Sequence, residues 1–190
     1  ANLAIAMAQG GLRTLLIDAD MRRAVIHKIF GMKSEPGLSN VLRGTIDPKD
    51  AIKTFADILT SDMGFDEALK IPGLDYLNIL VSGSLPQAPA ELLMSPEMDT
   101  LLAKLRDSYD IILIDSPPVL AVADAIILGP KADAVILVYR VGMTARTLLY
   151  RTKTQLVESG APVKGIVLNN ISPQIEMQYG YYAYYKYYGK

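Results

Sequence analysis

Acidic side chains stand directly after two short apolar runs of the sequence. Asp18 and Asp20 follow the first run, with Arg22 two residues later, and Asp115 follows the second run and precedes a Ser-Pro-Pro turn. Carboxylates just beyond a buried strand can be reached by a ligand, and Mg²⁺ prefers such oxygen ligands together with phosphates. A further carboxylate can orient or deprotonate an attacking hydroxyl. The residue types therefore suit a magnesium-nucleotide site, with catalytic candidates Asp18, Asp20, Arg22 and Asp115, of which Asp18 and Asp115 would hold the metal.

A simpler explanation exists for each acidic cluster. Asp20 could merely cap a helix that follows the first run, and Asp115 could cap a turn. Residues 111–118, however, have the form of a Walker B motif, whose aspartate holds magnesium during phosphoryl transfer. Two such strand ends in one parallel sheet favour the functional interpretation over coincidence.

The apolar pattern predicts five strands, at residues 13–18, 76–81, 111–115, 134–140 and 163–169. Helices are expected between them, over 2–9, 97–106, 121–128 and 144–158, and long loops over 34–44 and 82–96. Near-continuous apolar strands joined by helices predict an α/β fold, a doubly wound, mostly parallel sheet with helices on both faces. Ligands in such sheets bind at the carboxyl ends of the strands, where Asp18, Asp115 and Asn169 are expected.

Composition excludes several classes of function. The chain has 190 residues, 51% of them apolar, a formal net charge of −1, no cysteine and one histidine. This favours one compact cytosolic domain and argues against disulfides, cysteine-based zinc sites and nucleic acid as a partner. The longest apolar stretch, 111–128, contains Asp115 and Asp124 and two prolines, so we expect no membrane span.

The last twelve residues differ from the rest of the sequence. Residues 179–190 hold seven of the eleven tyrosines, separated only by Gly, Ala and Lys. A solvent-facing run this rich in tyrosine has no evident core to fill, although it could pack on a partner. We therefore expect a domain over 1–178 and a flexible tyrosine-rich tail over 179–190.

Several segments together resemble one known family. Residues 18–22 (D-A-D-M-R) look like the Walker A-prime motif, and residues 114–118 (I-D-S-P-P) like the Walker B motif, of the bacterial tyrosine kinases that regulate capsule and exopolysaccharide assembly. Residues 37–44, 83–93, 123–125 and 165–169 are also similar to that family. The resemblance covers nearly the whole chain and implies a P-loop NTPase-like fold of the deviant Walker type. It also implies that Asn169 binds the adenine base, although Asn169 or Asn170 could simply be a turn residue.

The resemblance implies an ATP- and Mg²⁺-dependent protein-tyrosine autokinase. Its phosphoacceptors would be the tail tyrosines, modified in trans within a homo-oligomer: Tyr179, Tyr181, Tyr182, Tyr184, Tyr185, Tyr187 and Tyr188. Each phosphate adds roughly −1.5 to −2 charges, enough to disrupt subunit contacts. By the same resemblance the partner is a membrane polysaccharide co-polymerase or activator. The kinase would then lie in the cytoplasm at the inner face of the membrane, held through an activator segment or partner outside this chain.

One expected motif is absent. These residues contain no G-x-x-x-x-G-K-S/T run, which cradles phosphates in P-loop proteins. Because residues 2–9 resemble the helix that follows that loop, we expect an upstream truncation, which would leave this polypeptide inactive and unable to bind nucleotide well. The upstream helix through which family members form rings is also missing. Two alternatives stay open: a partitioning or division-site switch ATPase of the same superfamily, and a non-catalytic interaction module.

Overall fold

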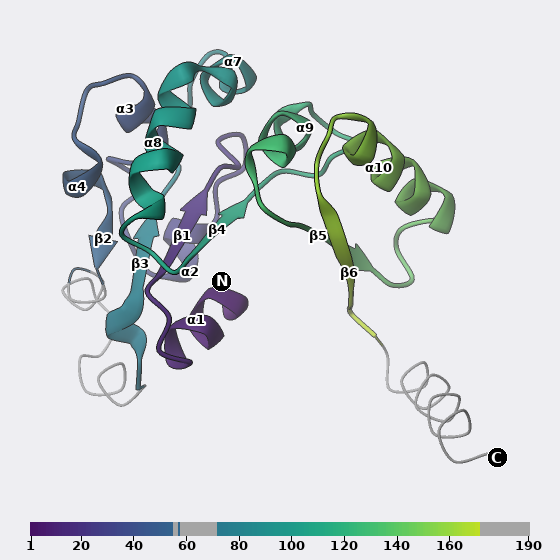
Figure 1. Cartoon of the computed structure of the whole chain (residues 1–190), viewed down its shortest axis with the longest axis horizontal. Coiled ribbons are helices and arrows are strands. Elements are labelled where there is room, and N and C mark those ends of the chain that lie inside the picture. Colours follow the sequence, from purple (N-terminus) through teal and green to yellow (C-terminus); the bar gives the residue numbers. More distant parts are fainter. Residues whose placement is uncertain (55–56, 58–71, 172–190) are drawn as a thin grey trace. The chain divides into compact units, whose positions relative to one another are not determined.

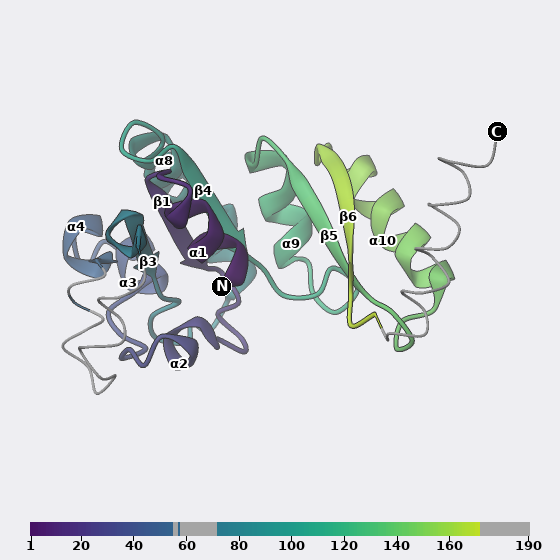
Figure 2. The same cartoon turned by 90° about the horizontal axis from the view of Figure 1, so that it is seen from below.

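The computed structural model describes residues 1–54, 57 and 72–171, and its chain divides into two compact units, Ala1–Leu128 and Gly129–Lys190. Each unit has its own sheet (Figures 1 and 2). The predicted tail at 179–190 lies outside the described residues. The units are therefore considered one at a time.

The sheet of the first unit has the strand order β2-β3-β1-β4. The strands are β1 (Thr14–Asp18), β2 (Lys53–Thr54), β3 (Leu77–Leu80) and β4 (Ile111–Asp115). β1 pairs in parallel with both β3 and β4, whereas the short β2 runs antiparallel to β3. The three predicted strands of this unit are confirmed, and β2 was not predicted because it contains only two residues.

Helices cover both faces of this sheet. They are α1 (Asn2–Gln9), α2 (Ile26–Ile29), α3 (Leu38–Leu42), α4 (Pro48–Ala51), α7 (Pro89–Met94), α8 (Pro96–Arg106) and α9 (Asp124–Leu128), with a 3₁₀ turn, η1 (Leu74–Tyr76), before β3. Successive side chains of a strand point to opposite faces. Leu15 and Ile17 accordingly join the core that contains α3 and α8 residues, whereas Leu16 joins the core that contains Ala4 and Ala8 of α1. The prediction of a mostly parallel sheet with helices on both faces is confirmed for this unit.

The second unit contains a two-stranded parallel sheet, β5 (Val135–Arg140) with β6 (Val163–Asn169). It begins with a 3₁₀ turn, η2 (Gly129–Lys131), and helix α10 (Arg146–Glu158) connects the strands. Both strands were predicted. α10 packs against β6, and Leu156 is the helix residue that is fully buried.

Two segments expected to be loops contain helices. α3 lies within 34–44, and its start is fixed by Asn40, whose Oδ1 accepts a hydrogen bond from the Gly37 N–H at 3.1 Å. α7 lies within 82–96 and begins at Pro89, a residue whose fixed φ favours the first turn of a helix. Gly37 and Pro89, which suggested loops, therefore mark helix starts.

Candidate active site

The two predicted acidic clusters meet at one edge of the first sheet. Asp18 and Asp115 are register partners at the carboxyl ends of β1 and β4, which lie side by side in Figure 1. The pairing continues one residue further, because the Ala19 N–H donates to the Asp115 carbonyl at 2.8 Å. The sequence predicted both aspartates at the carboxyl ends of strands, and the strand register adds that they lie next to each other.

Asp18 is the buried member of this cluster, with no exposed surface. Its Oδ1 accepts from the Asp20 N–H at 3.2 Å and its Oδ2 from the Ile26 N–H at 3.1 Å. Burial raises the pKa of Asp18, and the negative charges of Asp115 and Asp20 raise it further, although the two backbone hydrogen bonds act in the opposite direction. Asp18 thus fixes the loop from β1 to α2 through its two hydrogen bonds, although burial makes its ionised form less favourable.

Asp20 and Asp115 complete the acidic cluster. Asp20 is half-buried, and its Oδ1 accepts from the N–H groups of Arg22 at 3.2 Å and Arg23 at 2.9 Å, which closes a turn. Asp115 is exposed on one side, yet desolvation by its surroundings raises its pKa and the charge of Asp20 adds to this. Like charges gathered in this way favour binding of a cation.

Arg22 is held by a residue far away in the sequence. Its Nε donates to Asp124 Oδ2 at 3.0 Å and its Nη2 to Asp124 Oδ1 at 3.2 Å. Asp124 is the first residue of α9 and is fully buried, whereas 39% of the Arg22 side chain is exposed. The sequence marked residues 123–125 as family-like but did not assign Asp124 a partner, because a contact across 102 residues leaves no local pattern.

A second contact that the sequence did not reveal joins two of the family-like runs. The Leu38 N–H donates to the Val81 carbonyl at 2.7 Å, and Ser39 Oγ donates to the Ser84 carbonyl at 2.7 Å. Gly37 makes this approach possible, since a Cβ there would lie 2.2 Å from the Val81 oxygen. The loop that follows β3 is therefore fixed to α3 by a backbone hydrogen bond and by one from the Ser39 side chain.

Asn169 ends β6 in the second unit. Its carbonyl accepts from the Val141 N–H at 3.0 Å, and its side-chain Oδ1 accepts from the Asn170 N–H at 2.8 Å. Asn170 has a φ of 59°, so it is Asn170 that adopts the left-handed turn conformation. The sequence had left the turn role open between these two asparagines, and the backbone assigns it to Asn170.

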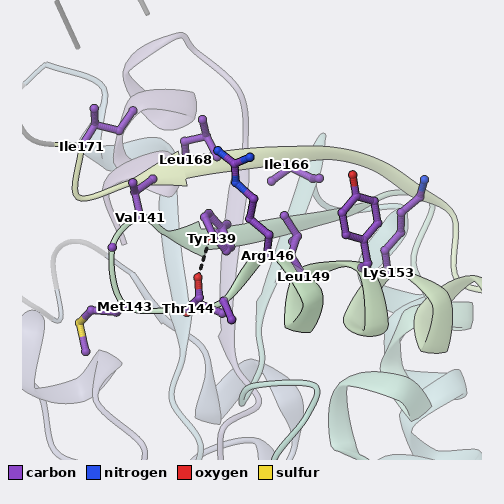
Figure 3. A pocket seen from close by; sticks show the side chains of 13 residues that line it. Tyr139, Val141, Met143, Thr144, Arg146, Leu149, Lys153, Ile166, Leu168 and Ile171 are labelled. Carbon is purple, nitrogen blue, oxygen red and sulfur yellow. Dashed lines mark hydrogen bonds between the residues drawn. The ribbon is translucent and has the colours of Figure 1, made fainter. Parts of the chain in front are cut away.

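An open pocket of about 740 Å³ borders this strand end. Figure 3 shows Tyr139 of β5 and Ile166 and Leu168 of β6 on one side of it, with Arg146 and Lys153 reaching in from α10. The dashed line marks the hydrogen bond that the Tyr139 hydroxyl donates to the Thr144 carbonyl. The walls are mostly apolar and carry two cationic groups, a combination that suits a flat ring with an anionic substituent.

The donor set of the first unit fits magnesium held together with phosphates. Among the described residues, no group of three or more His, Cys, Asp or Glu side chains is arranged to hold a metal ion. Magnesium at nucleotide sites commonly takes one or two carboxylates plus phosphate and water oxygens. Asp115 is the more available oxygen donor, because both oxygens of Asp18 already accept backbone hydrogen bonds.

Comparison with known proteins identifies the family. A family described as an AAA domain matches residues 1–156. The tyrosine-protein kinase YwqD of Bacillus subtilis is 35% identical over 183 residues, which are 96% of this chain and 70% of YwqD. The chain belongs to the bacterial tyrosine-protein kinases. EpsB of Ralstonia solanacearum is also similar to this chain, at 37% identity over 190 residues.

Solved structures agree with this assignment. The kinase domain of Escherichia coli tyrosine kinase ETK is 31% identical to this chain with a TM-score of 0.78, and the match covers 90% of this chain and 60% of the ETK chain. The septum site-determining protein MinD of Pyrococcus horikoshii, complexed with Mg-ADP, has a TM-score of 0.65 at 21% identity and shows the fold alone. This confirms the P-loop ATPase-like α/β fold.

The match covers only part of the larger relatives. The match to EpsB covers 98% of this chain but 23% of the length of EpsB. Within the residues that the structure describes, no helix has the length and apolar character needed to cross a membrane. The seven predicted phosphoacceptor tyrosines lie outside those residues.

Proposed function

We propose that the protein transfers the γ-phosphoryl group of ATP to tyrosines of its own carboxy-terminal cluster, residues 179–188. The observation that carries this proposal is the pairing of Asp18 with Asp115 at adjacent parallel strand ends, with Asp20 in the turn that Asp18 anchors. Membership of the tyrosine-kinase family supplies the reaction type.

Each acidic side chain has a proposed part in this reaction. Asp115, with Asp18 behind it, holds Mg²⁺, which when bound neutralises charge on the phosphates. Asp20 accepts the proton of the attacking tyrosine, whose ordinary pKa is about 10 and which therefore benefits from a nearby carboxylate. Arg22 places positive charge beside the transferring group. Asn169 remains the proposed residue for binding the adenine base.

The biological setting is proposed from the family resemblance. We propose that phosphorylation occurs in trans between copies of the protein and regulates polymerisation and export of a capsule or exopolysaccharide. A membrane co-polymerase, fused or separate, would activate the kinase at the inner face of the membrane. No nucleic acid is expected as a partner, in keeping with the net charge of −1.

A switch ATPase is the second candidate, because MinD shares the fold. Such a protein would hydrolyse ATP without modifying tyrosine. The tyrosine cluster argues against it, since seven tyrosines within ten residues are unexpected for a nucleotide switch. A non-catalytic module is less consistent with carboxylates kept at both strand ends.

Mass spectrometry of the tail distinguishes these candidates. The full-length protein is incubated with ATP and Mg²⁺ beside an Asp115→Ala control. The kinase proposal predicts phosphate on residues 179–188 in the parent protein and none in the Asp115→Ala variant. ATP hydrolysis with an unmodified tail would instead support the switch ATPase.

A further inference from the structure

The ion pair between Arg22 and Asp124 joins the acidic loop after β1 to the start of α9. Its two hydrogen bonds, 3.0 Å and 3.2 Å long, engage both carboxylate oxygens with two nitrogens of one guanidinium. A bidentate pair of this kind fixes the plane of the guanidinium as well as its position. Arg22 is therefore held in one orientation by a side chain outside its own loop.

Burial makes the pair persistent. Asp124 is completely buried, and a buried carboxylate that loses its cation is strongly unfavourable. Arg22 keeps 39% of its side chain exposed, and the pair uses two of the five N–H groups that a guanidinium carries. One edge of Arg22 is thus committed to Asp124, while the rest can reach a ligand on the solvent side.

The same pair also constrains Asp20. The Arg22 N–H donates to Asp20 Oδ1 at 3.2 Å, so the backbone of Arg22 forms part of the turn that orients this carboxylate. Asp18 fixes the loop from within, through the Asp20 and Ile26 N–H groups. Asp124 supplies an anchor to this loop that comes from a distant part of the chain.

We infer that Asp124 is a positioning residue for phosphoryl transfer, acting by orienting Arg22 and the turn that carries Asp20. This inference rests on the proposed function for the nature of the reaction. Asp124 itself is buried and reaches the reacting groups only through Arg22. Its removal should slow the transfer step more than it weakens ATP binding, because misplacement of a charged group is felt most in the transition state.

The chain offers a matched control at the opposite end of β1. Arg13 and Asp110 form the same kind of bidentate pair, with Nε to Oδ2 at 3.1 Å and Nη2 to Oδ1 at 2.7 Å. Both partners are partly exposed, at 53% and 38% of their side chains. Neither belongs to the acidic cluster, so Asp110→Asn reports what an Arg–Asp pair contributes to folding alone.

The test measures steady-state kinetics of tail phosphorylation in the full-length protein carrying Asp124→Asn or Asp110→Asn. We expect Asp124→Asn to lower kcat about 10- to 100-fold with KM for ATP changed less than about threefold. Asp110→Asn should keep kcat within about twofold. An unchanged kcat in folded Asp124→Asn protein would overturn the inference.

A second variant addresses loss of folding. In Arg22→Gln/Asp124→Asn, a neutral amide pair replaces the ions, so no unpaired buried charge remains. Because this variant also removes the charge of Arg22, its kcat is compared with that of Arg22→Gln alone. If Asp124 acts only through Arg22, the two kcat values should agree within about twofold, while the double variant is the more stable of the two. A kcat in the double variant at least about tenfold below that of Arg22→Gln would overturn the inference.

The rate of ATP hydrolysis separates this inference from the proposed function. If the parent protein hydrolyses ATP without phosphorylating its tail, the autokinase proposal fails. The positioning role is then judged from kcat for hydrolysis in the same variants. A hydrolysis kcat of Asp124→Asn within about twofold of the parent value would overturn the positioning role for hydrolysis as well.

Discussion

The two ends of the β1–β4 strand pair differ in how their charged side chains are arranged. At the amino end, Arg13 and Asp110 neutralise each other, and their hydrogen bonds hold the pKa of Asp110 at about 2. At the carboxyl end, Asp18 and Asp115 lie side by side, and burial raises both of their pKa values, with the charge of Asp20 adding to each shift. The first arrangement favours the folded state, whereas the second opposes it.

This difference supports the proposal that the carboxyl end is the functional one. A carboxylate with a raised pKa costs folding free energy at neutral pH unless a cation compensates it. Ion pairing of the kind seen at Arg13 would remove that cost, so carboxylates whose pKa values stay raised are consistent with a ligand that supplies further positive charge. Perturbed carboxylates in this position are a common property of catalytic sites.

The largest expected effect is on catalysis at the carboxyl end. Asp20→Asn should lower the rate of tail phosphorylation about 10²- to 10⁴-fold, the usual contribution of a general base, while ATP affinity stays within a few-fold. Phosphate incorporation and nucleotide titration of the full-length protein measure the two quantities. Phosphorylation at the parental rate would remove Asp20 from the mechanism.

A smaller effect is expected on stability where α3 meets the loop after β3. Gly37→Ala should lower the free energy of unfolding by about 1–3 kcal/mol, because the added Cβ meets the Val81 oxygen and the Gly83 N–H. Gly165→Ala in β6 is the control, since no atom lies within 4 Å of its added Cβ. Urea denaturation of both variants gives the comparison, and equal midpoints would show that the close approach is dispensable.

The smallest expected effect is the pH dependence of the amino end. Because the pKa of Asp110 falls from 3.8 to about 2 on folding, its contribution to stability is complete above pH 3.8 and disappears as the pH falls towards 2. Denaturation midpoints of the parent and of Asp110→Asn should therefore converge in acid. A difference that is constant from neutral pH to pH 2 would argue against ion pairing at Arg13.

Much of the fold could be predicted from residue patterns. The β1 run has three consecutive apolar residues and the β4 run has four, and each ends in an aspartate, so both the strands and their shared edge follow from the sequence. The start of α7 at Pro89 and of α3 after Gly37 were misjudged, since glycine and proline mark helix starts as well as loops.

The site itself could be predicted only in part. Asp18, Asp20 and Asp115 were found because each stands in a local motif. The partner of Arg22 was not, because Asp124 is brought to it by tertiary packing of α9 and nothing near either residue indicates the pair. Local motifs thus indicate the groups proposed to contact a ligand more readily than the group proposed to orient them.

The most direct test of this account compares Asp115→Asn with Asp110→Asn in the full-length protein, one variant for each end of β4. Calorimetry gives the melting temperature, and intact-mass spectrometry gives the rate of tail phosphorylation. The account predicts that Asp115→Asn loses phosphorylation at least about 100-fold with a melting temperature equal to or above that of the parent. It predicts that Asp110→Asn melts at a lower temperature and keeps its rate within about twofold. A destabilised but fully active Asp115→Asn protein would contradict the claim that the carboxyl end holds its charges for catalysis.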